Sequence, residues 1–74
     1  MTFDGFTNSL RAFARRRPFQ QFLVEFVSGD RLTIRHPEAI IIRSDRVVIF
    51  RSPGGTYRLF ESQSVCQLLD VAEA

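Results

Sequence analysis

The sequence contains no lysine or tryptophan, and it has only one cysteine and one histidine. A single cysteine excludes an internal disulfide, and one cysteine with one histidine argues against a structural zinc site built from this chain alone. No apolar run approaches the roughly 18 residues that a membrane helix needs. The opening residues, Met1-Thr2-Phe3-Asp4-Gly5, lack the basic and then apolar pattern of a secretory signal. We therefore expect a cytoplasmic protein with no membrane partner and no cofactor.

The chain has 74 residues, of which 45% are hydrophobic and eight are phenylalanines. This length predicts one domain over residues 1–74. A single core of this size rarely supplies more than about 3–5 kcal/mol of stability. We therefore expect dense aromatic packing together with self-association.

All ten basic residues are arginines, and four of them fall within residues 1–17, against one acidic residue there. These four are the candidate nucleic-acid-binding residues: Arg11, Arg15, Arg16 and Arg17. Guanidinium groups contact phosphates through two parallel hydrogen bonds, which suits RNA. Two other interpretations stay open at this point. The cluster is also compatible with a solvated helix end, where cations are favoured, and the use of arginine alone is also compatible with a biased genome base composition.

Residues 6–17 are predicted to form an amphipathic helix. Three apolar residues are spaced to share one face of it: Phe6, Leu10 and Phe13. Asp4 or Thr7 is expected to cap its N-terminus, and Pro18 to end it. A helix of about 12 residues is marginal alone, so this apolar face must pack against the rest of the chain.

Period-two patterns follow over residues 20–71 and predict strands. The expected strands are 22–27, 31–35, 39–42, 46–51 and 56–60. The expected turns are Ser28-Gly29-Asp30, Ser44-Asp45 and Pro53-Gly54-Gly55. The C-terminal segment is ambiguous, because 65–72 fits a helical stripe and 66–71 fits a short closing strand.

Strands 39–42 and 46–51 are apolar on both faces, which a half-exposed flat sheet would not tolerate. A small, strongly bent barrel explains this pattern, and so does an oligomer interface along a strand. We therefore predict a mainly β fold with an N-terminal α-helix, and a homo-oligomer in solution.

Three segments carry a resemblance to a known family: Asp4-Gly5-Phe6-Thr7-Asn8-Ser9-Leu10-Arg11, Arg15-Arg16-Arg17-Pro18 and Phe22-Leu23-Val24-Glu25-Phe26-Val27-Ser28-Gly29-Asp30. Together they resemble the opening of the bacterial Hfq branch of the Sm-like family, over roughly residues 4–35. The resemblance implies a helix on a strongly bent five-stranded antiparallel Sm-like barrel. It also implies rings, formed by pairing the fourth strand of one subunit with the fifth of the next, and RNA binding.

The chain departs from the Hfq pattern at the turn before the last strand. Hfq proteins carry a Tyr-Lys-His signature there, whereas this chain has Phe60-Glu61-Ser62-Gln63-Ser64-Val65, without lysine or histidine. A further segment, Arg35-His36-Pro37-Glu38, together with Pro18-Phe19, resembles small planctomycete-type bacterial proteins that have no established activity.

No constellation of catalytic residues is apparent. His36 is interpreted as part of a bend between strands, and Cys66 as a buried, unreactive thiol in an apolar segment. The carboxylates are scattered, and Gly54-Gly55 lacks the lysine and the following helix of a phosphate-binding loop. We therefore expect neither an enzyme nor a small-molecule substrate.

Two functional hypotheses remain. The first is an oligomeric, ring-forming RNA-binding protein that uses the Arg-rich helix. The second is a protein-interaction or structural module that oligomerises through its strands without binding nucleic acid.

Overall fold

A computed structural model describes residues 1–43, 47–52 and 54–71 of the chain. In chain order, its elements are α1 (Phe3–Ala14), β1 (Phe22–Phe26), β2 (Arg31–Ile34), the 3-10 helix η1 (Pro37–Ala39), β3 (Ile40–Ile42), β4 (Val47–Arg51), β5 (Tyr57–Glu61), the 3-10 helix η2 (Ser62–Ser64) and β6 (Val65–Asp70). Parts of four predicted elements lie outside the described residues. They are the turn at Ser44-Asp45, residue 46 of the fourth predicted strand, the proline of the Pro53-Gly54-Gly55 turn and residue 72 of the C-terminal segment.

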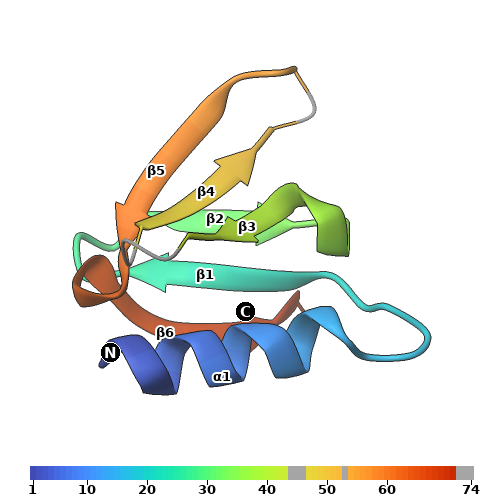
Figure 1. The fold of residues 1–74 in the computed structure, drawn as a ribbon, viewed down its shortest axis with the longest axis horizontal. Helices are drawn as coiled ribbons and strands as arrows, with labels where there is room; N and C mark the ends of the chain where they lie inside the picture. Colours follow the sequence, from blue (N-terminus) through green and yellow to red (C-terminus); the bar gives the residue numbers. More distant parts are fainter. Residues whose placement is uncertain (44–46, 53, 72–74) are drawn as a thin grey trace.

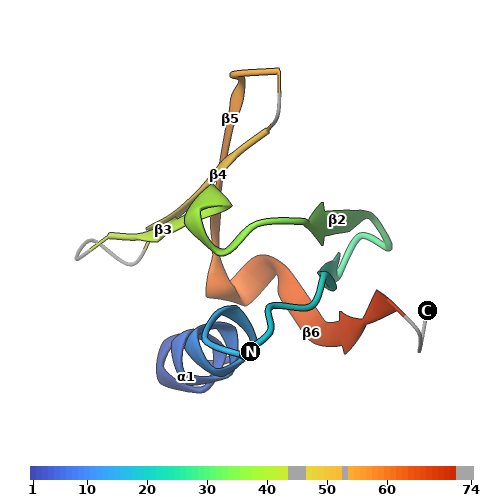
Figure 2. The ribbon, with the colours of Figure 1, turned by 90° about the vertical axis from the view of Figure 1, so that its right-hand side faces the viewer.

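The strands form two separate antiparallel sheets, and this overturns the predicted five-stranded Sm-like barrel. One sheet has the order β2-β1-β6 and the other has the order β3-β4-β5. Neither sheet closes on itself among the described residues. In Figure 2 the tip of the β4–β5 hairpin points away from the sheet that contains β2 and β6. The helix α1 lies at the opposite end of the view from this tip, at the lower left.

The break between the two sheets lies at His36-Pro37-Glu38, where one continuous strand does not form. Pro37 has no N–H to donate to a strand ladder, and residues 37–39 coil into η1, whose last N–H, from Ala39, donates to the carbonyl of His36. The chain therefore leaves the first sheet after β2 and enters the second at β3. The barrel prediction was wrong because it treated this bend as an interruption within a single closed sheet.

The N-terminal helix is present but begins and ends three residues earlier than predicted, over Phe3–Ala14 rather than 6–17. Its cap is Thr2, whose Oγ1 accepts a hydrogen bond from the Gly5 N–H at 3.1 Å. Thr7, one of the two expected caps, is instead buried inside the helix and donates to the carbonyl of Asp4. The last turn closes on the carbonyl of Arg11, so residues 15–17 follow the helix rather than form its end.

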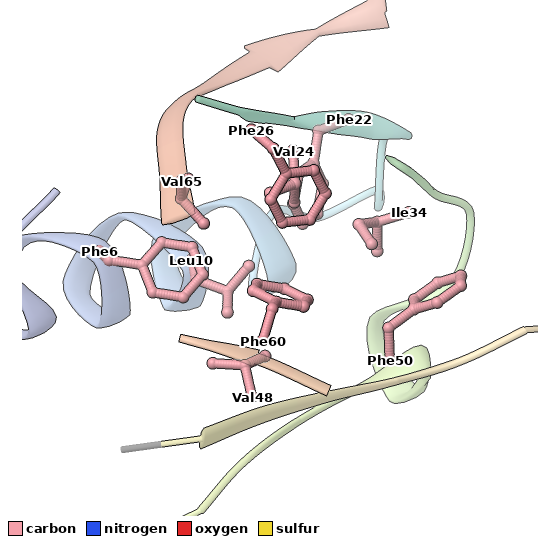
Figure 3. Close-up of a cluster of buried hydrophobic side chains, with 10 residues drawn as sticks. All are labelled: Phe6, Leu10, Phe22, Val24, Phe26, Ile34, Val48, Phe50, Phe60 and Val65. Atoms are coloured by element: carbon pink, nitrogen blue, oxygen red, sulfur yellow. The ribbon is translucent and has the colours of Figure 1, made fainter. Parts of the chain in front are cut away.

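The hydrophobic core lies between α1 and the two sheets (Figure 3). Its fully or nearly buried members are Phe6, Leu10, Phe22, Val24, Phe26, Ile34, Val48, Phe50, Phe60 and Val65. Phe60 of β5 joins the layers, since its ring centroid lies 6.1 Å from that of Phe6 and 5.0 Å from that of Phe26. Phe13 completes the predicted apolar face of the helix, half-buried against Phe22.

The first predicted hairpin is confirmed, with β1 and β2 paired from Phe22↔Ile34 to Glu25↔Arg31. Its turn uses Gly29 at φ 95°, a left-handed conformation that favours glycine. The C-terminal segment is a strand, β6, which pairs with β1 on the side opposite β2. In Figure 1, β6 runs between β1 and α1.

Candidate nucleic-acid interface

Three of the four candidate arginines, Arg11, Arg15 and Arg17, are exposed. Arg11 lies in the last turn of α1, and Arg15 and Arg17 follow directly after it. Within the described part of the chain, no carboxylate lies within ion-pair distance of any of these three guanidinium groups. Their positive charge is therefore available to an external anion.

Arg16 is held within the protein. One of its terminal nitrogens donates to the Asp70 carboxylate at the end of β6, and the other donates to the carbonyl of Gln20 at 3.0 Å. The guanidinium also lies over the ring of Phe13, 4.6 Å from its centroid. Arg16 therefore connects the segment after α1 to β6. Of the four candidate arginines, three are exposed cations and one, Arg16, makes contacts within the protein.

Arg31 is a second internally paired arginine. Its Nε donates to Glu25 Oε2 at 3.0 Å, and Gln67 Nε2 donates to the other oxygen of the same carboxylate at 2.8 Å. These hydrogen bonds, that of Gln67 first, lower the pKa of Glu25 below its ordinary value. Glu25 on the central strand β1 thus binds both neighbouring strands through side chains.

A groove of about 690 Å³ lies between η1 and the ends of β4 and β5. Its lining residues are Thr33, Arg35, His36, Glu38, Ala39, Phe50, Arg51, Ser52, Gly55 and Tyr57. In Figure 1, η1 and the ends of β4 and β5 that form the hairpin tip lie on the same side of the molecule. We call this hollow the hairpin groove.

Hydrogen bonds at the turn of the β4–β5 hairpin fix one wall of the hairpin groove. The Ser52 N–H donates to the Thr56 carbonyl at 2.8 Å, and the two side-chain hydroxyls lie 2.6 Å apart. The Gly55 N–H donates back to the Ser52 carbonyl, with Gly55 at φ 86°. Arg51 and Tyr57 are paired directly beneath this closure. Their backbones are therefore held in place beside the groove.

A smaller hollow lies between η1 and α1. It is lined by Leu10, Arg11, Ala14, Pro37, Ile40 and Ile42. Pro37 of η1 contributes to this hollow, whereas the neighbouring Glu38 and Ala39 line the hairpin groove. The 3-10 helix thus separates Arg11 on one side from Arg35 and Arg51 on the other.

The hairpin groove was not found from the sequence. Its residues come from 33–39 and 50–57, which periodicity treats as unrelated strands and turns. The sequence offered only single positions as a signal: two arginines at strand ends, and the chain's only tyrosine two residues after the glycine-rich turn. Only the fold brings these positions together.

The two residues considered for chemistry lie apart. His36 lines the hairpin groove together with Glu38, whereas Cys66 lies on β6. Cys66 is exposed, so the prediction of a buried thiol was wrong. A β-bulge explains this, because Glu25 of β1 pairs with Gln67 and the next residue, Phe26, pairs with Val65, which leaves Cys66 as the extra residue outside the core. Over residues 1–43, 47–52 and 54–71, no three His, Cys, Asp or Glu side chains gather closely enough to hold a metal ion.

The outward face of the second sheet carries an apolar row, which we call the outer row: Ile41, Ile49 and Leu59. Ile41 pairs with Ile49 across β3 and β4, and Ile49 pairs with Leu59 across β4 and β5. Ile41 is 50% exposed and Leu59 is 58% exposed. The opposite faces of these strands supply Val48, Phe50 and Phe60 to the core. The sequence predicted strands that are apolar on both faces. In the structure one apolar face of this sheet packs in the protein's own core, and the other faces solvent.

No helix among the described residues is long and apolar enough to cross a membrane. Comparison with family models, with curated proteins and with solved structures gives no match to this chain.

Proposed function

We propose that this chain is a cytoplasmic, self-associating protein that binds single-stranded RNA through the arginines at the C-terminal end of α1. The observation that carries the proposal is the state of Arg11, Arg15 and Arg17, which are exposed and have no carboxylate partner among the described residues. Phosphate contacts by such residues release counterions from the nucleic acid, and this release supplies most of the affinity of sequence-independent binding.

The location of the three arginines supports this assignment. They extend from the last helical turn into the segment that follows, and Arg11 borders the apolar hollow beside η1. A single strand could place phosphates on the guanidinium groups and unstacked bases near apolar side chains, as is usual for single-strand binding. Arg16, fixed between Asp70 and Phe13, keeps the adjacent backbone in place.

The test is the salt dependence of binding to a fluorescently labelled single-stranded RNA, measured by anisotropy. The Arg11→Gln, Arg15→Gln, Arg17→Gln triple variant should bind more weakly at every salt concentration. Its plot of log affinity against log salt should be flatter by about two units, at about 0.7 for each lost phosphate contact on a single strand.

A matched pair of single variants controls for net charge. Arg15→Gln and Arg31→Gln each remove one positive charge, but Arg31 is engaged with Glu25. Only Arg15→Gln should reduce affinity appreciably. The proposal is refuted if the parent protein shows no binding at low salt, or if the triple variant binds as tightly as the parent.

The outer row favours a second candidate function, a protein-interaction module that does not bind nucleic acid. Three apolar side chains in register on an exposed sheet face are suited to packing against another protein. The occupant we expect is a second copy of this chain, because a two-fold axis lets the same row pack on itself. Light scattering on purified protein, followed by the ratio of absorbance at the nucleic-acid and protein maxima, separates the two candidates. An oligomer free of RNA that also fails the anisotropy test supports the module.

A further inference from the structure

We propose that the hairpin groove binds a nucleotide, with the phosphate held by Arg35 and Arg51 and the base packed against Tyr57. The inference does not depend on RNA binding at the helix. A free nucleotide and one nucleotide of an RNA strand present the same chemistry to the groove, and the experiment below distinguishes them.

The charge in the groove suits a ligand that carries one phosphate. Arg35 follows β2 and Arg51 ends β4, so two cations from distant parts of the chain line the same hollow. Both are exposed, and neither has a carboxylate within ion-pair distance among the described residues. A guanidinium binds a phosphate through two parallel hydrogen bonds. A pair of them can therefore hold such a group from two sides.

The groove also contains acceptors, which a bare phosphate would not use. Glu38 lines it, and a carboxylate accepts hydrogen bonds but donates none when ionised. Ribose hydroxyls and the amino groups of bases are donors that match this residue. Thr33 and Ser52 add hydroxyls that both donate and accept. The lining therefore favours a ligand with a sugar and a base over an inorganic anion.

Aromatic side chains provide the surface for the base. Tyr57 is 61% exposed, although its ring would be expected to seek burial in a chain of this size. Phe50, which is almost buried, lies at the boundary of core and groove and contributes an apolar floor. Bases stack on such rings, and this stacking contributes substantially to the affinity of single-strand binding proteins.

The size and rigidity of the groove are appropriate for a small ligand. Its volume of about 690 Å³ falls within the range of about 300–1,000 Å³ that is typical of small-molecule sites. The closure of the hairpin by Ser52, Gly55 and Thr56 holds Arg51 and Tyr57 at fixed positions on neighbouring strands. A site built on strand ends in this way loses little entropy on binding.

The composition of the chain gives this site its own optical probe. Tyr57 is the only tyrosine and there is no tryptophan, so the intrinsic fluorescence of the protein comes from the groove. The experiment titrates the protein with adenosine monophosphate and, separately, with a short single-stranded RNA. N-acetyltyrosinamide is titrated in parallel to correct for absorption of light by the nucleotide. We expect a saturable change in Tyr57 emission, accompanied by a shift of the Gly55 amide resonance in NMR spectra.

Variants assign the change to the groove. Arg35→Gln with Arg51→Gln should weaken binding by roughly tenfold or more, since hydrogen bonds between charged groups are among the strongest in proteins. Arg31→Gln with Arg58→Gln removes the same number of charges outside the groove and should leave the Tyr57 titration unchanged. Unaltered thermal midpoints show that the variants are folded. Adenosine and inorganic phosphate, each alone, should bind more weakly than adenosine monophosphate.

The outcomes are separable from those of the proposed function. Saturation with adenosine monophosphate supports a site for a free nucleotide, and saturation with RNA alone supports a site for one nucleotide of a strand. If neither ligand changes Tyr57 emission and the Gly55 resonance, or if the groove variants saturate like the parent, the inference is wrong. RNA binding that depends on Arg11, Arg15 and Arg17 without any response from Tyr57 would preserve the proposed function and reject the groove.

Discussion

At the scale of single residues, adjacent arginines in this chain have different tasks. Arg15 and Arg17 extend into solvent, whereas Arg16 joins the segment after α1 to Asp70 on β6 across 54 positions of sequence. Both members of this ion pair keep about a third of their side-chain surface exposed. Solvent therefore screens their attraction, and a surface pair of this kind contributes about 0–1 kcal/mol.

A double-mutant cycle on Arg16→Gln and Asp70→Asn should give a coupling energy of about 0.5–1 kcal/mol in the free energy of unfolding, measured by urea denaturation. Arg16→Gln should also leave the salt slope of RNA binding unchanged, because the guanidinium is already engaged. A coupling energy of zero would show that the pair contributes nothing to stability.

Glu25 is the second residue whose charge acts within the fold. Hydrogen bonds from Gln67 and Arg31 lower its pKa in the folded protein, whereas an unfolded glutamate titrates near 4.3. The stabilisation from these contacts is therefore fully present above the unfolded pKa and is lost as the pH falls through the folded pKa.

The difference in thermal midpoint between the parent and Glu25→Gln should accordingly be largest above about pH 5 and shrink as the solution is acidified. Gln67→Ala removes the main hydrogen-bond donor to Glu25. In this variant the thermal midpoint should fall less steeply with decreasing pH than it does in the parent protein. Scanning calorimetry over a pH series checks both. A difference in midpoint that stays constant from neutral to acidic pH would exclude this linkage.

At the scale of elements, Phe60 holds the two sheets and the helix together. It leaves the second sheet at β5 and packs on Phe6 of α1 and on Phe26 of β1. The ring of Phe26 is covered on another side by the Arg58 guanidinium, 4.4 Å from its centroid. Because the sheets share no ladder pairing among the described strands, this aromatic contact carries much of their association.

Phe60→Ala should therefore lower the free energy of unfolding by about 3–5 kcal/mol, as is usual for a buried phenylalanine. Leu59→Ala, at the next position on the same strand, is the matched control. Its side chain is exposed, so it should change stability by no more than about 0.5 kcal/mol in dilute solution. Equal effects of the two substitutions in denaturant titrations would contradict this account of the packing.

The elements also show what the sequence could and could not predict. Spacing placed Phe6 and Leu10 on one buried face, because the period of a helix is a local property. The helix boundaries shifted because Thr2 offers a cap earlier than Asp4 or Thr7. β6 could be decided only by its pairing with β1, which is a long-range contact. The same limit concealed the hairpin groove and the separation of the two sheets at Pro37.

At the scale of the whole molecule, the outer row is the feature that the folded monomer leaves unexplained. Burying an isoleucine or leucine side chain stabilises an assembly by about 1.5–3 kcal/mol for each residue. Ile41 and Leu59 are already about half buried in the monomer, so two copies that pack their outer rows together would gain about half of this for each side chain, less the entropy lost on association. Strand β5, which carries Leu59 of the outer row, is also an edge strand. Among the described strands it pairs only with β4.

We expect the molar mass from light scattering to rise with protein concentration, and Leu59→Glu to hold the protein as a monomer. Val27→Glu is the control, since Val27 is 71% exposed but lies in the turn after β1, which belongs to the other sheet. It places the same charge on an apolar surface position and should leave association intact. A parent protein that stays monomeric at high concentration would remove the second copy as the occupant of this face.

The separation of the strands into two ladders also bears on how the molecule opens under native conditions. β1 is bonded on both sides, by β2 and by β6, and β4 is bonded on both sides, by β3 and by β5. β5 is an edge strand, bonded to β4 alone among the described strands, and it projects with β4 from the body as a hairpin (Figure 2). Proteins open in cooperative units with different free energies. The amide protons of the edge strand β5 should therefore exchange with deuterium before those of β1. Since the hairpin tip borders the groove, a bound nucleotide would slow exchange there selectively and leave the β1 amides at their original rate.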